Sequence, residues 1–229
     1  MDINSAIQTI CVAAIPLIFA ITLHEAAHAW IASKLGDQTA SIQGRVSLNP
    51  IKHIDPIGTV VLPLIMLAIG GFIFGWAKPV PIAWQNLRNP RRDMALVAIA
   101  GPGANLVMAF FWAIVGKINQ LIFLHPGIEH TMHPIGAFIH YAALFGIMIN
   151  CVLLVINLIP LPPLDGSRIV TALLPPALAR KYNRLEMYGI WIFLGLLIVM
   201  VYTGAIVVIT APIQWLMQTI QHLFLLPTS

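Results

Sequence analysis

The chain has 229 residues, of which 59% are hydrophobic and only 9% are charged, and its formal net charge is +4 at pH 7. Because soluble globular domains carry about 25% charged residues, this composition excludes a soluble domain and indicates an integral membrane protein. The positive charge does not indicate a nucleic-acid partner, since the basic residues lie in short loops between apolar runs, where they act as orientation signals.

The first apolar run predicts a membrane-spanning or buried helix over residues 5–33, with Gly36 as its end. This run contains the pattern HEAAH. At a spacing of four residues, His24 and His28 share one helical face and can bind one metal ion, with Glu25 beside them as a base for a water molecule. Ionisable groups at membrane depth are costly and usually functional, which favours a zinc-peptidase site over a structural role.

The next stretch, residues 37–55, is polar and contains β-branched residues and an Asn-Pro turn signal, so we predict a loop or a short hairpin near the membrane face. Residues 57–75 are apolar for about the length of one span but contain Pro63 and the pair Gly70-Gly71. Hydropathy alone leaves open whether this segment crosses the membrane.

Two clear spans are predicted from Met94 to Val115 and from Ile135 to Ile159, and the prolines that follow the second must end its helix. A last apolar run covers residues 187–212, and the tail at 213–226 alternates at helical spacing, as interfacial helices do.

We therefore expect an all-α polytopic membrane protein with about four spanning helices, one re-entrant or short apolar segment and a small β-like loop. It forms a single domain over residues 1–229. Its catalytic core covers about residues 10–170, and a C-terminal helix with an interfacial tail covers about residues 187–226.

A catalytic zinc site generally has three protein ligands and leaves one position for water. Asp165 is the leading candidate for the third ligand, because it is the acidic residue of an apolar, proline-broken stretch at a helix end, and unwound backbone at membrane depth lines protein cavities. On local sequence alone, an Asp-Gly turn at the water surface is an equal alternative.

Three motifs in chain order, HEAAH at 24–28, GPGAN at 101–105 and NLIPLPPLDG at 157–166, resemble the site-two protease family of intramembrane metalloproteases. The stretches GRVSLNP, HIDPIGT, FGWAKPVP and RNPRRDM are similar to its small prokaryotic members, and the chain has no room for a PDZ domain. The resemblance covers about residues 16–170.

The family pattern pairs the two histidines with the aspartate eight residues after an asparagine, which Asn157 and Asp165 match. The resemblance implies that the Asn157 amide contacts a developing oxyanion or the backbone of an extended substrate. Asn105 is a second candidate for such a role, with the equal alternative that its amide satisfies a carbonyl freed by a proline kink.

If the three ligands bind one ion, the helices over 5–33 and 135–159 must run parallel, because each brings its ligands near its C-terminal end. Residues 57–75 must then enter and return on the same side. This arrangement puts every basic loop residue except Lys117 on one face, which the positive-inside rule assigns to the cytoplasm.

We predict an intramembrane metalloprotease with one zinc ion in the plasma membrane of a prokaryote, although iron and cobalt suit the same ligands. Its substrate is a transmembrane segment of another protein, unwound locally and paired as a strand with residues 40–48 or 76–84. The first alternative is a divalent-metal transporter that uses the same residues as an ion pathway, although no inverted repeat is visible.

A second alternative is an inactive relative that binds helices as a scaffold, against which Glu25 argues. We expect the histidines at positions 125, 130 and 133 to be solvated loop residues rather than a second metal site.

Overall fold

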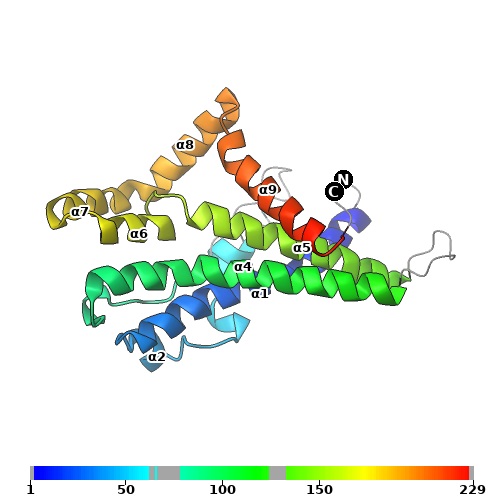
Figure 1. Ribbon diagram of the computed structural model, residues 1–229, viewed down its shortest axis with the longest axis horizontal. Helices are drawn as coiled ribbons and strands as arrows, with labels where there is room; N and C mark the ends of the chain where they lie inside the picture. Colours follow the sequence, from blue (N-terminus) through cyan, green and yellow to red (C-terminus); the bar gives the residue numbers. More distant parts are fainter. Residues whose placement is uncertain (1–2, 62–64, 66–77, 124–132, 227–229) are drawn as a thin grey trace.

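The computed structural model describes residues 3–61, 65, 78–123 and 133–226, and these residues form helices, turns and irregular segments (Figure 1). Four helical stretches of this part are long and apolar enough to cross a membrane, namely Gln8–Lys34, Pro90–Phe123, Pro134–Asn157 and Pro176–Thr203. The predicted all-α polytopic fold with about four spanning helices is confirmed.

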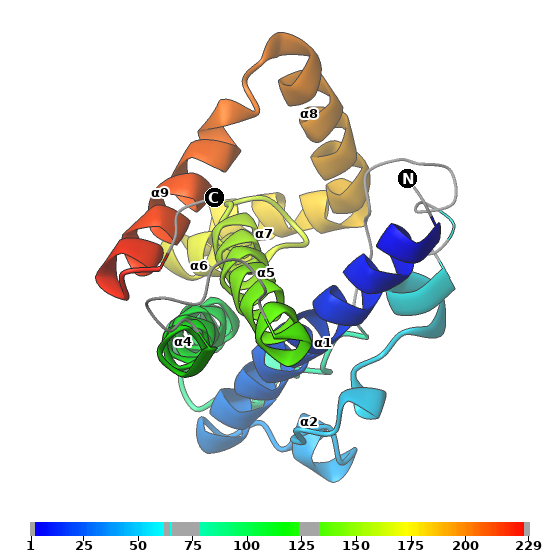
Figure 2. The ribbon, with the colours of Figure 1, turned by 90° about the vertical axis from the view of Figure 1, so that its right-hand side faces the viewer.

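Three long helices form the core of the molecule: α1 (Ile3–Lys34), α4 (Pro90–Phe123) and α5 (Pro134–Asn157). They lie side by side in Figures 1 and 2. Small buried residues such as Ala109, Ala113 and Ala143 allow α4 and α5 to approach closely, as is usual between helices in membranes. Apolar side chains on the outer face of α4, such as Val107 and Phe111, are exposed, which suits a surface in contact with lipid.

The helices α1 and α5 run in the same direction, and α4 runs opposite to them (Figure 1). This is the orientation predicted from the ligand positions. At the C-terminal end of α1, Gly36 has a φ of +117°, a backbone conformation that side-chain-bearing residues rarely adopt, and the helix ends there as expected.

The predicted re-entrant segment lies mostly outside the described residues, which include only its first residues, within the π-helix η2 (Pro56–Val61), and Ile65. On either side of it, the Lys78 amide donates a hydrogen bond to the His53 carbonyl (3.0 Å). The residues that flank the segment are therefore neighbours, and the course of the chain between them lies outside the described residues.

The β-like loop predicted for residues 37–55 is wrong, because the described residues contain no strand. This stretch instead holds two short helical turns, α2 (Thr39–Ile42) and η1 (Pro50–Lys52). The physical reason is local side-chain hydrogen bonding, since the Asp37 carboxylate accepts from the Thr39 amide (3.0 Å) just before α2 and the Asn49 side chain, at the N-cap of η1, accepts from the Ile51 amide (3.1 Å).

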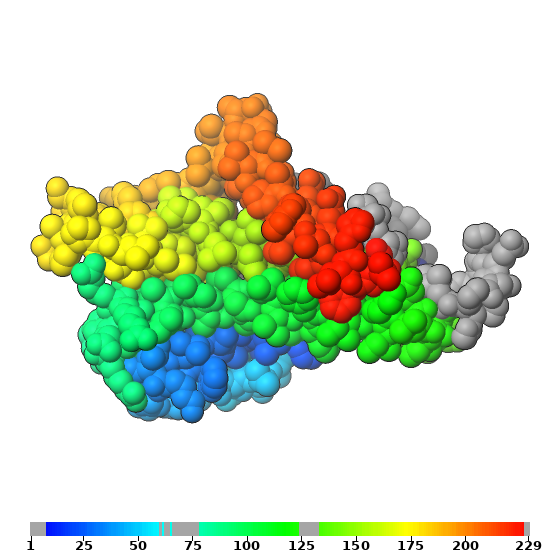
Figure 3. All heavy atoms as spheres, in the orientation of Figure 1, coloured from blue at the N-terminus to red at the C-terminus, as the bar shows by residue number. Residues whose placement is uncertain are grey.

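Beyond α5 the chain forms a series of shorter helices: α6 (Asp165–Leu173), α7 (Pro176–Asn183), η4 (Arg184–Tyr188), α8 (Gly189–Thr203) and α9 (Val207–Leu223). The apolar run expected to continue to residue 212 breaks at Gly204, whose φ is 74°. Figure 3 shows α8 and the start of α9 standing out from the body of the molecule. Ile213 and Ile220 of α9 are buried in the same cluster as residues of α4 and α5.

Candidate metal centre

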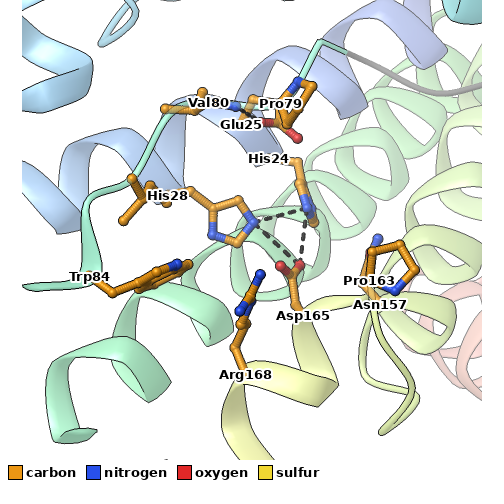
Figure 4. A pocket seen from close by; sticks show the side chains of 11 residues that line it. His24, Glu25, His28, Pro79, Val80, Trp84, Asn157, Pro163, Asp165 and Arg168 are labelled. Carbon is orange, nitrogen blue, oxygen red and sulfur yellow. Dashed lines mark hydrogen bonds and ion pairs between the residues drawn. The ribbon is translucent and has the colours of Figure 1, made fainter. Parts of the chain in front are cut away.

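Two helices bring the three predicted metal ligands together (Figure 4). His24 and His28 lie one turn apart on the same face of α1, and their Nε2 atoms are 3.1 Å apart. Asp165, the first residue of α6, points its Oδ2 atom at both of them, at 3.3 Å from each Nε2. The ligand atoms of the three side chains lie within 4.8 Å of one another, close enough to share one ion.

The other ring nitrogen of each histidine is hydrogen-bonded to a buried acceptor. The Nδ1 atom of His24 lies 2.6 Å from the Asn105 side-chain oxygen, and that of His28 lies 2.7 Å from the Val97 carbonyl. Because a carbonyl oxygen can only accept, the assigned tautomer has the proton on Nδ1 and a lone pair on Nε2. Such contacts fix the tautomer and the ring orientation of metal-bound histidines.

The donor set fits a zinc ion. Both histidines are buried, with 8% and 6% of their surface exposed, and their Nε2 lone pairs converge on a carboxylate oxygen. That Asp165 oxygen is itself buried and has no hydrogen-bond partner among the described residues, which is costly unless a cation lies there. Two imidazoles and one carboxylate are a common ligand set of catalytic zinc.

The ionised state of Asp165 follows from its surroundings. Burial raises the pKa of this carboxyl group, but hydrogen bonds and positive charge from His24 and His28, when their Nε2 atoms carry protons, outweigh burial and lower the pKa below its ordinary value. A metal ion held by the Nε2 lone pairs would act on the carboxyl group in the same direction. Asp165 is therefore a carboxylate, the form that binds metal ions.

Gly101 of α4 lies directly against the two imidazoles. A Cβ atom added at this position would lie 2.3 Å from His28 Nε2 and 2.6 Å from His24 Cε1, so only glycine lets the α4 backbone pack beneath the ligands. Sequence reasoning singled out the motif GPGAN but missed this requirement.

Asn105 of the same motif is fully buried and faces His24 rather than the cavity described below. Its amide nitrogen donates to the Ala20 carbonyl (3.3 Å) and to the Asn150 side chain (3.0 Å), so both of its N–H groups are used. A direct contact between Asn105 and a substrate is therefore incompatible with this arrangement. Asn150 was missed, although an amide in the middle of the apolar α5 is a signal of its own.

A cavity of about 350 Å³ opens beside the metal ligands. It is lined by His24, Glu25, His28, Pro79, Val80, Ile82, Trp84, Asn157, Pro163, Asp165 and Arg168. Glu25 and Asn157 thus lie where the motifs predicted them, at the surface of one chamber that also exposes the metal ligands (Figure 4).

One side of this cavity is formed by residues 78–83, which we call the wall segment. The Val80 amide of this segment donates to Glu25 Oε2 (2.8 Å). Buried side chains hold the segment at both ends, since Arg45 donates to the carbonyls of Lys78 (2.8 Å) and Pro79 (3.3 Å) and Asp37 accepts from the Ala83 amide (2.8 Å).

Sequence reasoning assigned no site role to Asp37 and gave Arg45 only a role in membrane orientation. A signal existed for Arg45, because it belongs to the stretch GRVSLNP that resembles the protease family. Neither His53 nor His133 lines the cavity. His53 bonds the Ser47 carbonyl (2.8 Å) and His133 stacks on Phe123, while the histidines at positions 125 and 130 lie outside the described residues.

The apolar helices and the His–His–Asp cluster beside a glutamate define a membrane-embedded metallopeptidase. Comparison with known proteins gives the family: residues 12–202 match Peptidase family M50, and the chain belongs to that family.

The chain is 42% identical over 187 residues to "Putative zinc metalloprotease YwhC" of Bacillus subtilis, which covers 80% of this chain and 78% of that protein. It is 31% identical over 183 residues to "Putative zinc metalloprotease Rip2" of Mycolicibacterium smegmatis, and the match covers 79% of this chain and 64% of that protein. "Putative zinc metalloprotease Rip2" of Mycobacterium tuberculosis is 30% identical over 146 residues, and the match covers 64% of this chain and 51% of that protein. No solved structure matches the chain.

These findings identify a bacterial intramembrane zinc metalloprotease, and they do not favour a metal transporter. Zinc as the cofactor agrees with the relatives' names and with the ligand cluster of His24, His28 and Asp165. The family and the apolar helices indicate that the protein acts on membrane substrates within the lipid bilayer.

Proposed function

We propose that His24, His28 and Asp165 hold the catalytic zinc ion and that Glu25 is the general base of peptide-bond hydrolysis. The substrate is a peptide bond in or near a transmembrane segment of another membrane protein. The observation that carries this proposal is the convergence of the three ligand atoms within 4.8 Å, in a cavity that Glu25 also lines.

The bound metal supplies Lewis acidity, which polarises the peptide carbonyl and makes water a nucleophile near neutral pH. Glu25 accepts the proton of the attacking water and passes it to the leaving nitrogen. The Val80 amide fixes one oxygen of Glu25, and among the described residues the other oxygen has no hydrogen-bond partner. One carboxylate oxygen is thus oriented and the other is free to move a proton.

A transmembrane helix hides its backbone, so the scissile bond must be unwound before Glu25 and water can reach it. We propose that the unwound strand lies along the wall segment, since residues 40–48 begin within the helical turn α2. Asn157 is placed to hold a substrate carbonyl, because its amide uses one N–H for the Leu153 carbonyl (2.9 Å) and has a second to offer.

We also propose that the metal-centre end of the protein faces the cytoplasm. This end carries the loops that follow α1 and precede α4, which are rich in lysine and arginine, whereas Lys117 lies in the distal part of α4 (Figure 1). Single cysteines at Thr39, Arg88 and Lys117, labelled from outside intact cells in a cysteine-free background, test this. Only the cysteine at position 117 should react, and labelling of positions 39 and 88 from opposite faces would disprove the arrangement.

The main test measures the zinc content of the detergent-solubilised protein beside cleavage of a synthetic transmembrane helix. Wild type and Glu25→Gln should each hold about one zinc ion per chain, as expected for a single His₂Asp site, and only wild type should cut. Asp165→Ala should lose most of its zinc, because a ligand is gone.

Retention of both zinc and activity by Asp165→Ala would disprove its assignment as a ligand. Cleavage by Glu25→Gln at the wild-type rate would remove Glu25 from the mechanism. A transporter would keep its metal flux in Glu25→Gln, so a flux assay in vesicles separates the two functions.

A further inference from the structure

We propose that Arg168 is a further catalytic residue, whose guanidinium donates to the carbonyl oxygen of the scissile peptide bond and stabilises the negative charge that develops there. This inference rests on the proposed function. It adds an electrophile from the protein to the metal ligands and Glu25.

Arg168 lies at the surface of the cavity that holds the metal ligands. Arg168 follows Asp165 by three residues in α6, so both side chains project from one face of that helix. Figure 4 shows the Arg168 side chain rising beside Asp165 toward the imidazole of His28. It lines the same cavity as the metal ligands and Glu25, and 21% of its side chain is exposed.

Two contacts from other segments orient the guanidinium. Its Nη2 atom donates to the Glu186 carboxylate of η4, and its Cζ atom lies 5.3 Å from the centre of the Trp84 ring in η3 (Trp84–Asn86). Because 42% of the Glu186 side chain is exposed, the ion pair adds little to stability. Its effect is to hold the planar group in one orientation at the cavity.

Arg168 does not pair with Asp165, although the two lie one helical turn apart. Among the described residues its ion-pair partner is Glu186, while the Asp165 oxygen faces the two imidazoles. Asp165 is therefore left to the metal. Arginine has five N–H donors, and Glu186 engages only the Nη2 nitrogen, so donors remain for a substrate.

Glu186 balances the charge of Arg168, and Asp165 is left to balance the metal. Negative charge that develops on a substrate carbonyl in the cavity adds a further favourable interaction with the guanidinium. Peptide hydrolysis provides that charge on the carbonyl oxygen when the C–O bond to water forms. The C–N bond then breaks, the proton taken from water by Glu25 goes to the leaving nitrogen, and Arg168 keeps all of its protons throughout. The residue acts only through its charge and its hydrogen bonds.

The experiment compares Arg168→Met and Arg168→Lys with the control Arg180→Met, which removes an exposed cation of α7 that does not line the cavity. The probe is a synthetic transmembrane helix with a fluorophore–quencher pair, cleaved in detergent micelles. Arg168→Met should lower kcat by about 10²-fold with little change in KM, as removal of an oxyanion donor does. Arg168→Lys should recover part of this loss, and Arg180→Met should match wild type.

Four further measurements separate catalysis from structure. Zinc content and thermal midpoint should be unchanged in Arg168→Met, and in a Glu25→Gln background the substitution should leave binding of the uncut helix unchanged. Glu186→Gln should cost only a few-fold in kcat, because it loosens the guanidinium without removing it.

A loss of zinc or a lower thermal midpoint in Arg168→Met would overturn the proposal, as would an increase in KM at constant kcat. Equal losses of kcat in Glu186→Gln and Arg168→Met would show instead that the ion pair between the two residues has a structural role, joining α6 to η4. Each of these outcomes leaves the wild-type protein cutting with Glu25 required, so a failure for Arg168 is distinct from a failure of the protease function.

Discussion

The two sides of the cavity are built in different ways. The ligand side consists of the long helices α1 and α4 and the start of α6, and buried groups such as Asn105 and the Val97 carbonyl orient its histidines. The opposite side is the wall segment, which has no regular secondary structure over its length and is held by side chains of the preceding loop, Asp37 and Arg45.

This difference separates two tasks. A metal site needs ligands held within a few tenths of an ångström, which packed helices provide. A surface that receives an unwound peptide needs backbone that is not already committed to a helix or a sheet. We therefore expect changes on the ligand side to remove zinc, and changes around the wall segment to leave zinc bound while turnover falls.

The largest effect is expected for Gly101→Ala. The new methyl group would lie 2.3 Å from His28 Nε2, so α4 or the imidazoles must move, and a displacement of this size costs about 10²-fold or more in activity. Zinc content, measured on the purified protein, should fall with activity. The matched control is Gly103→Ala in the same motif, where an added Cβ meets nothing within 4 Å. Equal zinc content in the two variants would contradict the close packing at Gly101.

Asn105→Leu, with the next largest expected effect, tests the hydrogen bond that orients His24 on the ligand side. The Nδ1–H of His24 would lose its acceptor in a buried place, so the imidazole is no longer held in its metal-binding tautomer. Zinc affinity should fall by about 10–100-fold, measured by competition with a chelator. Asn119→Leu is the control, since Asn119 is also buried in α4 but bonds the Gly136 carbonyl (3.0 Å) away from the metal. A similar loss in both variants would indicate general destabilisation.

The ligand side was also the part that the sequence predicted well. The spacing of His24 and His28 requires only the period of a helix. Asp165 was predicted from its place in a proline-broken apolar stretch and from the resemblance to the site-two protease family. The stretch at residues 37–55 was predicted as β-like from its β-branched composition. Its short turns depend instead on hydrogen bonds that the Asp37 and Asn49 side chains accept from backbone amides, and these override the composition. Long-range contacts such as Arg45 with Pro79 leave no periodic signal in the chain.

Arg45→Met tests the wall segment. The substitution removes the donors to the Lys78 and Pro79 carbonyls next to Val80, whose amide orients Glu25. Turnover should fall by about 10-fold through misplacement of this carboxylate, with zinc content unchanged. Arg92→Met, which removes an exposed cation from α4, should have no effect on either quantity. Loss of zinc in Arg45→Met would contradict the expectation that changes around the wall segment leave the metal bound.

The smallest effect is expected for Asp37→Asn. Burial raises the pKa of Asp37, but hydrogen bonds from Thr39, Ala83 and Asn86 outweigh burial and lower the pKa below its ordinary value. A lowered folded-state pKa means that ionised Asp37 stabilises the fold fully above the unfolded value of about 3.9, and that this contribution is lost as the pH falls through the folded value.

The Asp37→Asn side chain has one oxygen instead of two, so one of these bonds is lost at about 1 kcal/mol of unfolding free energy, and turnover should fall only a few-fold. Because both pKa values lie below 5, the stability difference between wild type and variant should be constant from pH 5 to 8 and should shrink below about pH 4. Denaturation at several pH values measures this. A difference that changes between pH 6 and 8 would mean that another group, rather than the Asp37 carboxylate, holds the end of the wall segment.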